Sequence, residues 1–279
     1  MENVRAEITR SIPGNVGTNN ALLIHPLPMR TVFRDCFLAN FAVSPEALAA
    51  RLPPHIQPDV HHGRAFVSVV IARLEKMRPA FLPRMFGVTY MQVVYRAVVR
   101  CCEERGVSFL RSDADNSLMV LGGNALTFFR FHRANISWQK DSGAIRFSLT
   151  PGNGDAARID ADFDIAGGTE TLPKSSCFTS LNEAQRALTE LYVAFGPQEC
   201  NSKVNAVRIQ RDTWQSRVVE DRLGTYEAMR SGVLFNAGEA ELDSVLYVES
   251  LNYHWYRRCF VEAGTNASVV RETSTERPS

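Results

Sequence analysis

Short runs of β-branched and aromatic residues follow one another along most of the chain, and they constrain its fold more than any other feature. The runs cover residues 31–42, 63–74, 88–102, 106–112, 129–138, 144–152, 157–165, 203–210 and 244–258. Residues 88–102 and 106–112 are joined by a short polar segment typical of a hairpin. Many strands at short spacing with few helices predict an α+β fold, dominated by a curled, mostly antiparallel β-sheet.

Helical patterns are few. In "SPEALAARLPP", Ser44 is a suitable N-cap, Pro45 fits the first turn, and Pro53 and Pro54 stop the helix. Residues 116–128 predict a short helix that loses order at the pair of glycines 122 and 123.

The clearest helix lies in "TSLNEAQRALTELYVAF", where Ser180 and Glu183 form a capping box. Apolar residues follow at four-three-four spacing on one face of this helix, namely Ala184, Leu188, Leu191 and Phe195. A further short helix is predicted in "TYEAMRSG", residues 225–232. Because no linker rich in proline, glycine or serine divides the chain, we expect one domain over residues 23–264, with flexible segments at 1–22 and 265–279.

Composition restricts the partners. The chain has 279 residues, of which 45% are hydrophobic, so it can bury a sizeable core without disulfides or metals. The 31 Lys and Arg residues nearly balance the 30 Asp and Glu residues, which argues against nucleic acid or an anionic membrane as the main partner. No apolar run is long enough for a transmembrane helix, and the start of the chain lacks the apolar segment of a secretory signal.

No cofactor or metal site is predicted from the sequence. None of the six cysteines lies in a C-x-x-C pair, so we expect reduced thiols in a cytoplasmic protein. The adjacent His61 and His62, and also His25 and His55, are interpreted as solvated turn residues. Residues 111–116, "RSDADN", lack the glycine and the distal glutamate of a calcium loop. No G-x-S-x-G or G-x-G-x-x-G motif is present.

Polar residues on strands that otherwise resemble core are the best site candidates. Alternation in "YMQVVYRAVV" places Gln92 and Arg96 on one face, while the other face is apolar apart from Tyr95. Within "ALTFFRFHRANISW", Arg130 and His132 share one face. Buried charge must be paired or neutralised, so such residues either meet in a common lumen or lie on a wet surface. Periodicity leaves both alternatives open.

Several segments, in order, resemble the YqjF-like group of the acetoacetate decarboxylase-like superfamily. "FRDCFLANFAVSPEALAARLPPHIQPDVHHGRAFVSVV" resembles the opening of that group, with a strand, a short helix ending in "LP", and a second strand. "YMQVVYRAVV", "RGVSFLRSDADN", "ALTELYVAFG" and "VRIQRDTW" resemble its later motifs. The resemblance covers residues 30 to 260. It implies a cone-like barrel, formed by the curled sheet around an apolar cavity, with a few helices outside.

The resemblance also implies a chemistry that this chain cannot perform unchanged. The decarboxylases use a lysine that forms a Schiff base with a keto acid. The matching positions here are Phe131 and His132, and no lysine lies between Lys76 and Lys140. Schiff-base decarboxylation is therefore not expected. A family arginine matches Arg34, and Ser68 replaces a family glutamate.

Our first hypothesis is a cofactor-independent small-molecule enzyme of lyase, dehydratase or cyclase type, which fits specialised metabolism by analogy. Arg34 and Arg96 would hold an acidic, keto or enolic substrate and His132 would move a proton. The expected substrate-binding residues are Gln92, Tyr95, Ser68, Arg130, Phe129 and Phe131. The alternatives are a non-catalytic small-molecule binder on the same fold and, if no cavity exists, a scaffold protein. Exposed edge strands make a homo-oligomer plausible.

Overall fold

Strand β1 (Met29–Val43) runs through the middle of the sheet, with β13 (Ala240–Glu262) on one side and β3 (Ala65–Pro79) on the other, both antiparallel. The computed structural model describes residues 25–198 and 203–262. The remaining strands are β2 (Ile56–Pro58), β4 (Val88–Cys101), β5 (Glu104–Ala114), β6 (Phe131–Lys140), β7 (Ala144–Pro151), β8 (Ile159–Thr169), β9 (Val193–Gln198), β10 (Lys203–Arg211), β11 (Arg217–Asp221) and β12 (Thr225–Tyr226).

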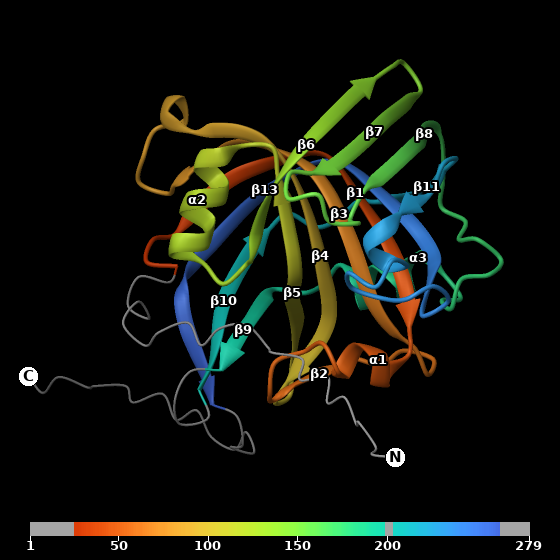
Figure 1. Cartoon of the computed structure of the whole chain (residues 1–279), viewed down its shortest axis with the longest axis horizontal. Coiled ribbons are helices and arrows are strands. Elements are labelled where there is room, and N and C mark those ends of the chain that lie inside the picture. Colours follow the sequence, from red (N-terminus) through yellow and green to blue (C-terminus); the bar gives the residue numbers. More distant parts are fainter. Residues whose placement is uncertain (1–24, 199–202, 263–279) are drawn as a thin grey trace, which may run out of the picture.

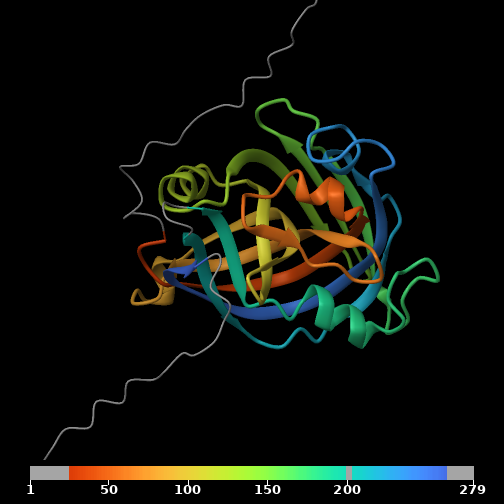
Figure 2. The same ribbon diagram turned by 90° about the horizontal axis from the view of Figure 1, so that it is seen from below.

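The sheet curls until its strands meet again (Figures 1 and 2). One closed path of pairings runs β13–β1–β3–β4–β5–β6–β7–β8–β11 and back to β13. A second path leaves β5 through β9 and β10 and also returns to β13. In the described part of the chain only β5–β6 and β5–β9 pair in parallel. The prediction of an α+β fold on a curled, mostly antiparallel sheet is therefore confirmed.

Both faces of the central strands are buried, against two separate apolar clusters. On β4, Met91, Val93 and Tyr95 belong to one cluster, while Tyr90 and Val98 belong to the other. This is the alternation predicted from the sequence. Because both faces of these strands are covered, apolar residues point to both sides, and the strand sequences show little alternation between hydrophobic and polar residues.

A bulge at Asp35 reverses the alternation of β1, so that residues of opposite parity face the same side of the sheet before and after it. Between Arg34 and Phe37 the strand carries one residue more than its partner β3, and Asp35 has a φ of 46°. The Asp35 carboxylate accepts hydrogen bonds from Tyr247 Oη and from Lys140 Nζ, each at 2.7 Å. Odd-numbered Phe33 therefore faces the same cluster as even-numbered Leu38.

Helix α1 (Pro45–Ala49) forms as predicted, with the Ser44 hydroxyl accepting from Ala47 N. Helix α2 (Ser117–Leu126) differs from the prediction, because it continues through both glycines. A Cβ added to Gly123 would lie 2.4 Å from the Phe131 ring, so glycine is required there for close packing and does not end the helix.

Helix α3 (Leu181–Leu188) is shorter than predicted. Its Ser180 cap is confirmed, although the Glu183 carboxylate reaches back to Thr179 N and not to Ser180 N. Phe195 lies on β9, which pairs with β5 and β10, so sheet pairing overrides the helical spacing of the sequence. The segment predicted as a helix at 225–232 contains β12 and a single 3₁₀ turn, Glu227–Met229. The segments 1–22 and 265–279 lie outside the described residues.

Candidate functional site

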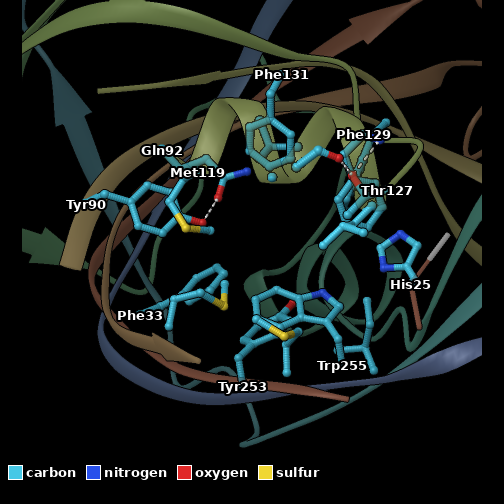
Figure 3. A pocket seen from close by; sticks show the side chains of 18 of the residues that line it. His25, Phe33, Tyr90, Gln92, Met119, Thr127, Phe129, Phe131, Tyr253 and Trp255 are labelled. Carbon is cyan, nitrogen blue, oxygen red and sulfur yellow. Dashed lines mark hydrogen bonds between the residues drawn. The ribbon is translucent and has the colours of Figure 1, made fainter. Parts of the chain in front are cut away.

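A cavity of about 330 Å³ lies between the sheet and helix α2. Strands β1, β3, β4, β5, β10 and β13 form its wall, and most of its lining is apolar. Phe131 and Met119 lie on one side of the open space, with Phe33, Tyr253 and Trp255 opposite (Figure 3). The volume is in the range of small-molecule sites.

Helix α2 is fixed over the cavity by a polar clamp. The Asn124 side chain donates to Phe131 O at 2.8 Å and accepts from Phe131 N at 2.7 Å. The Thr127 hydroxyl accepts from Phe129 N at 3.2 Å and donates to Gly123 O at 2.7 Å. These bonds tie the helix to the start of β6, so that Phe129 and Phe131 line the cavity.

Arg96 contributes a guanidinium to this apolar space. The residue is only 5% exposed, and its Nη2 donates to Leu188 O, at the end of α3, at 2.9 Å. The partial negative charge of a helix C-terminus favours a cation there. Its Nε is buried without a hydrogen-bond partner, and its guanidinium lies 6.0 Å from the Trp214 ring. Burial lowers the pKa of Arg96, yet a guanidinium keeps its charge in proteins.

Two further polar side chains of β4 line the cavity as a pair. Tyr90 Oη donates to Gln92 Oε1 at 3.0 Å (Figure 3). Burial, helped by Asp115, raises the pKa of Tyr90, so the phenol stays protonated at neutral pH. The pair can therefore offer hydrogen-bond donors to a ligand, because the amide nitrogen of Gln92 is not used within it.

His25 also lines the cavity, a role that sequence reasoning missed. The residue is 7% exposed, packs against the rings of Phe128 and Phe129 and has a buried Nε2 without a partner. Burial, with a smaller effect of Arg258, lowers its pKa to about 4, so the imidazole is neutral at pH 7. Its neighbour Pro26 suggested a solvated turn, and no local pattern signals that a hydrogen bond from His25 N to Leu126 O draws it inward.

Of the residues proposed from the sequence, the cavity brings together Gln92, Arg96, Phe129 and Phe131. His132 is adjacent to Phe131 on β6 and does not line the cavity. It pairs across the sheet with Asp113, next to the Arg111–Asp113–Asp155 ion-pair cluster. Burial and the Arg111 charge lower the pKa of His132. The four side chains that were expected to converge on one point therefore do not meet, namely Arg34, Arg96, Arg130 and His132.

The other proposed residues also lie elsewhere. Arg34 is on the outer face of β1, with Nε 3.5 Å from a Glu75 carboxylate oxygen. Arg130 is exposed. Ser68 is buried and donates to Asn40 Oδ1 at 2.7 Å, and Tyr95 is fully buried on the opposite face of β4 from Arg96. Arg34 and Tyr95 are on strand faces turned away from the cavity, whereas Ser68 shares the face of Val70 on β3 but does not line the cavity.

Within residues 25–198 and 203–262, no group of three His, Cys, Asp or Glu side chains is arranged to hold a metal ion. In the same residues, no helix has the length and hydropathy needed to cross a membrane.

Residues 30–251 match DUF2071, a family described as an uncharacterized conserved protein. The chain belongs to the DUF2071 family. One curated relative of this DUF2071 protein is the uncharacterized protein YqjF of Bacillus subtilis (strain 168), which is 26% identical over 162 residues. That match covers 58% of this chain and 67% of YqjF. The resemblance to the YqjF-like group seen in the sequence is confirmed.

Solved structures place the DUF2071 protein on the acetoacetate decarboxylase-like fold. The enduracididine biosynthesis enzyme MppR with bound HEPES gives a TM-score of 0.58 at 12% identity, covering 94% of this chain and 100% of MppR. The acetoacetate decarboxylase of Legionella pneumophila gives 0.58 at 13% identity, covering 92% and 98%. At these identities the comparison defines the fold alone.

Proposed function

We propose that this DUF2071 protein is a cofactor-independent small-molecule enzyme of lyase, dehydratase or cyclase type. Its substrate would be a compact acid with an apolar body and a keto or enolic group. The single observation that carries the proposal is Arg96, a buried guanidinium with an unpartnered Nε in an otherwise apolar cavity. Burying a charged group with one donor unsatisfied is unfavourable, and an anionic ligand would supply the missing acceptor.

Arg96 would bind the carboxylate or the enolate oxygen of the substrate. In a dry, low-dielectric cavity a fixed cation stabilises developing negative charge strongly. The Tyr90–Gln92 pair would orient a carbonyl oxygen, and the rings of Phe129 and Phe131 would hold the apolar body.

His25 would accept or return the proton. A base works best when its pKa lies near the working pH, and the pKa of His25 in the empty cavity is lower, about 4. An anionic substrate in the same cavity would raise that pKa toward neutrality. His25 therefore takes the role that the sequence suggested for His132.

A Schiff-base route is not part of the proposal. No lysine lines the cavity among the described residues, and Phe131 is one of the two positions that match the lysines of the decarboxylases. Similar structures include MppR complexed with the condensation product of pyruvate and imidazole 4-carboxaldehyde, so this fold holds keto-acid-derived ligands in at least that protein.

A second candidate function is non-catalytic binding of the same acids. One observation favours it, because Tyr90, Gln92 and Thr127 already have hydrogen-bond partners within the protein. A binder needs only one or two free polar groups, while an enzyme needs several that converge.

The test uses phenylpyruvate and phenylacetone, which differ in that only the first carries a carboxylate. Binding is followed by the fluorescence of Trp214 and Trp255, which line the cavity. We expect phenylpyruvate to bind saturably, and Arg96→Met to weaken it roughly tenfold or more, the value of a charged hydrogen bond. Phenylacetone should change little. Arg146→Met, at an exposed ion pair outside the cavity, is the control.

Proton transfer is measured as deuterium incorporation at the carbon next to the keto group, by NMR in D₂O. If the protein is an enzyme, exchange should be faster with the wild type than without protein. It should be slower with His25→Phe than with the wild type, and as fast as the wild type with His132→Ala. Binding without faster exchange would establish the second candidate. Failure of phenylpyruvate to bind would overturn both candidate functions.

A further inference from the structure

A second cavity of about 340 Å³ lies at the outer face of the strands that form the first. Its lining includes Arg30, Arg78, Arg84, Arg211, Asp212 and His254. Cross-strand pairing places part of this set in one row, because Arg30 lies opposite Arg78 on β3 and opposite His254 on β13. Gln210 on β10 lies opposite His254 and completes the row. We call this cavity the arginine shelf.

The charge of the arginine shelf is not balanced. Among the described residues that line it, Asp212 is the only acidic one. Its Oδ2 already accepts from the backbone N and the side-chain Nδ2 of Asn252, at 2.9 and 2.8 Å. None of the four arginines forms an ion pair within residues 25–198 and 203–262. Arg34 and Arg73, on the same outer face, instead share the carboxylate of Glu75. Arginines elsewhere on this face thus have an acidic partner.

Two of the four arginines, Arg211 and Arg78, are held in place and keep donors free, while Arg30 and Arg84 are exposed. Arg211 has Nε and Nη2 buried without hydrogen-bond partners, and its guanidinium lies 4.8 Å from the Tyr192 ring and 5.5 Å from the Trp214 ring. Arg78 uses Nε and Nη1 on the carbonyls of Leu82 and Lys76, at 3.0 and 2.9 Å, which leaves Nη2. Rigid guanidinium groups lose little entropy on binding an oxyanion.

This arrangement costs stability in the free protein. Like charges directly opposite each other on neighbouring strands repel, as Arg30 and Arg78 must. A buried donor with no acceptor is also unfavourable, as with Nε and Nη2 of Arg211. A multiply charged anion would remove both penalties together.

We propose that the arginine shelf binds a phosphate group, either as inorganic phosphate or as part of a phosphorylated small molecule. One guanidinium fork satisfies a carboxylate, whereas four arginines on different segments suit an anion with oxygens on several sides. The inference is independent of the proposed function, although Tyr253 borders both cavities.

The experiment is calorimetric titration with inorganic phosphate, pyrophosphate and citrate at constant ionic strength. We expect saturable binding of both phosphate compounds, weakened roughly tenfold or more in Arg30→Gln and Arg78→Gln. Arg146→Gln removes the same charge from an exposed ion pair away from the shelf and should bind normally. Tighter binding of pyrophosphate than of phosphate would indicate a phosphorylated ligand, and equal binding would indicate the free ion.

Thermal unfolding in phosphate-free buffer separates binding from a structural role. Removing one of two repelling charges should leave Arg30→Gln at least as stable as the wild type. Phosphate should raise the Tm of the wild type and of Arg146→Gln more than that of Arg30→Gln. Equal phosphate affinity in Arg30→Gln and Arg146→Gln, absence of saturable binding, or a preference for citrate would each overturn the proposal.

Discussion

The Phe131 ring lies directly against the backbone of Gly123, so that a Cβ on Gly123 would stand 2.4 Å from ring atom Cδ2 and 2.5 Å from Cε2. This contact sets the distance between helix α2 and strand β6, and with it the height of the cavity. Gly122, the neighbour of Gly123, also lines the cavity, but a Cβ on Gly122 would meet nothing within 4 Å. The two adjacent glycines therefore form a matched pair for substitution.

Gly123→Ala should destabilise the protein by about 1–3 kcal/mol, because overpacking forces the helix and the ring apart. Gly122→Ala should instead stabilise it by about 0.5–1 kcal/mol, since alanine in a helix interior loses less backbone entropy than glycine. Urea unfolding of both variants checks the difference. Equal changes in the free energy of unfolding would show that the Phe131 ring moves aside without destabilising the protein.

The lowered pKa of His25 makes stability depend on pH. The folded-state pKa of about 4 lies below the usual value of 6.5, so the unfolded chain takes up the proton first as the pH falls. Stability is fully present above pH 6.5 and is lost on acidification toward pH 4. The His25 contribution should fall by about 2 kcal/mol between pH 7 and pH 5, at 1.36 kcal/mol per pKa unit.

This loss is measured by urea unfolding at both pH values. His25→Phe should show a smaller loss than the wild type, whereas His55→Asn, at an exposed turn residue with a φ of 67°, should behave like the wild type. If His25→Phe loses as much stability as the wild type, His25 is not the group that titrates.

The buried ion-pair cluster beside His132 should be sensitive to removal of one partner. Arg111 donates from Nε and Nη2 to the two oxygens of Asp113, each at 2.7 Å, and also contacts Asp155 at 2.6 Å. Arg111→Met would leave the fully buried Asp113 unpaired and should cost about 3–5 kcal/mol.

The double variant Arg111→Met/Asp113→Leu should recover much of that loss, because an apolar pair of similar volume needs no compensation. The exposed pair Arg146–Asp141 provides the comparison, since Arg146→Met should change the free energy of unfolding by about 0–1 kcal/mol. Chemical denaturation of the three variants gives all values. A small loss in Arg111→Met would mean that water reaches Asp113.

Arg96→Met should leave the protein as stable as the wild type, or stabilise it by about 1–4 kcal/mol, despite the loss of the bond to Leu188 O. The reason is that a buried guanidinium with an unpartnered Nε is retained at a cost in desolvation. Differential scanning calorimetry without ligand provides the measurement. Strong destabilisation would assign Arg96 a structural role in anchoring α3.

Local patterns predicted much of the fold. The faces of β4 follow strict alternation, and the Ser44 and Ser180 caps are local chemistry, so all three could be derived from the sequence. Gln92 and Arg96 were found as cavity residues for the same reason.

Other features depend on contacts that are distant in sequence. The glycines of α2 suggest a break until Phe131 is placed against one of them. His132 lies one residue from a cavity position, and only the registry of β6 against β5 shows that it sits beside Asp113. His25 becomes a cavity residue because its backbone N donates to Leu126 O and its backbone O accepts from Arg258 N, and no periodicity encodes these contacts.

The bulge at Asp35 divides β1 into two halves with different surroundings. Before it, Met29 and Phe33 line the cavity while Arg30 borders the arginine shelf; after it, both faces of the strand are buried in core. Substitutions in the first half change the lining of the two cavities, and those in the second half change the packing of the core. The shape and charge of both cavities can therefore change at a few positions of one strand, without rebuilding the core that keeps the chain folded.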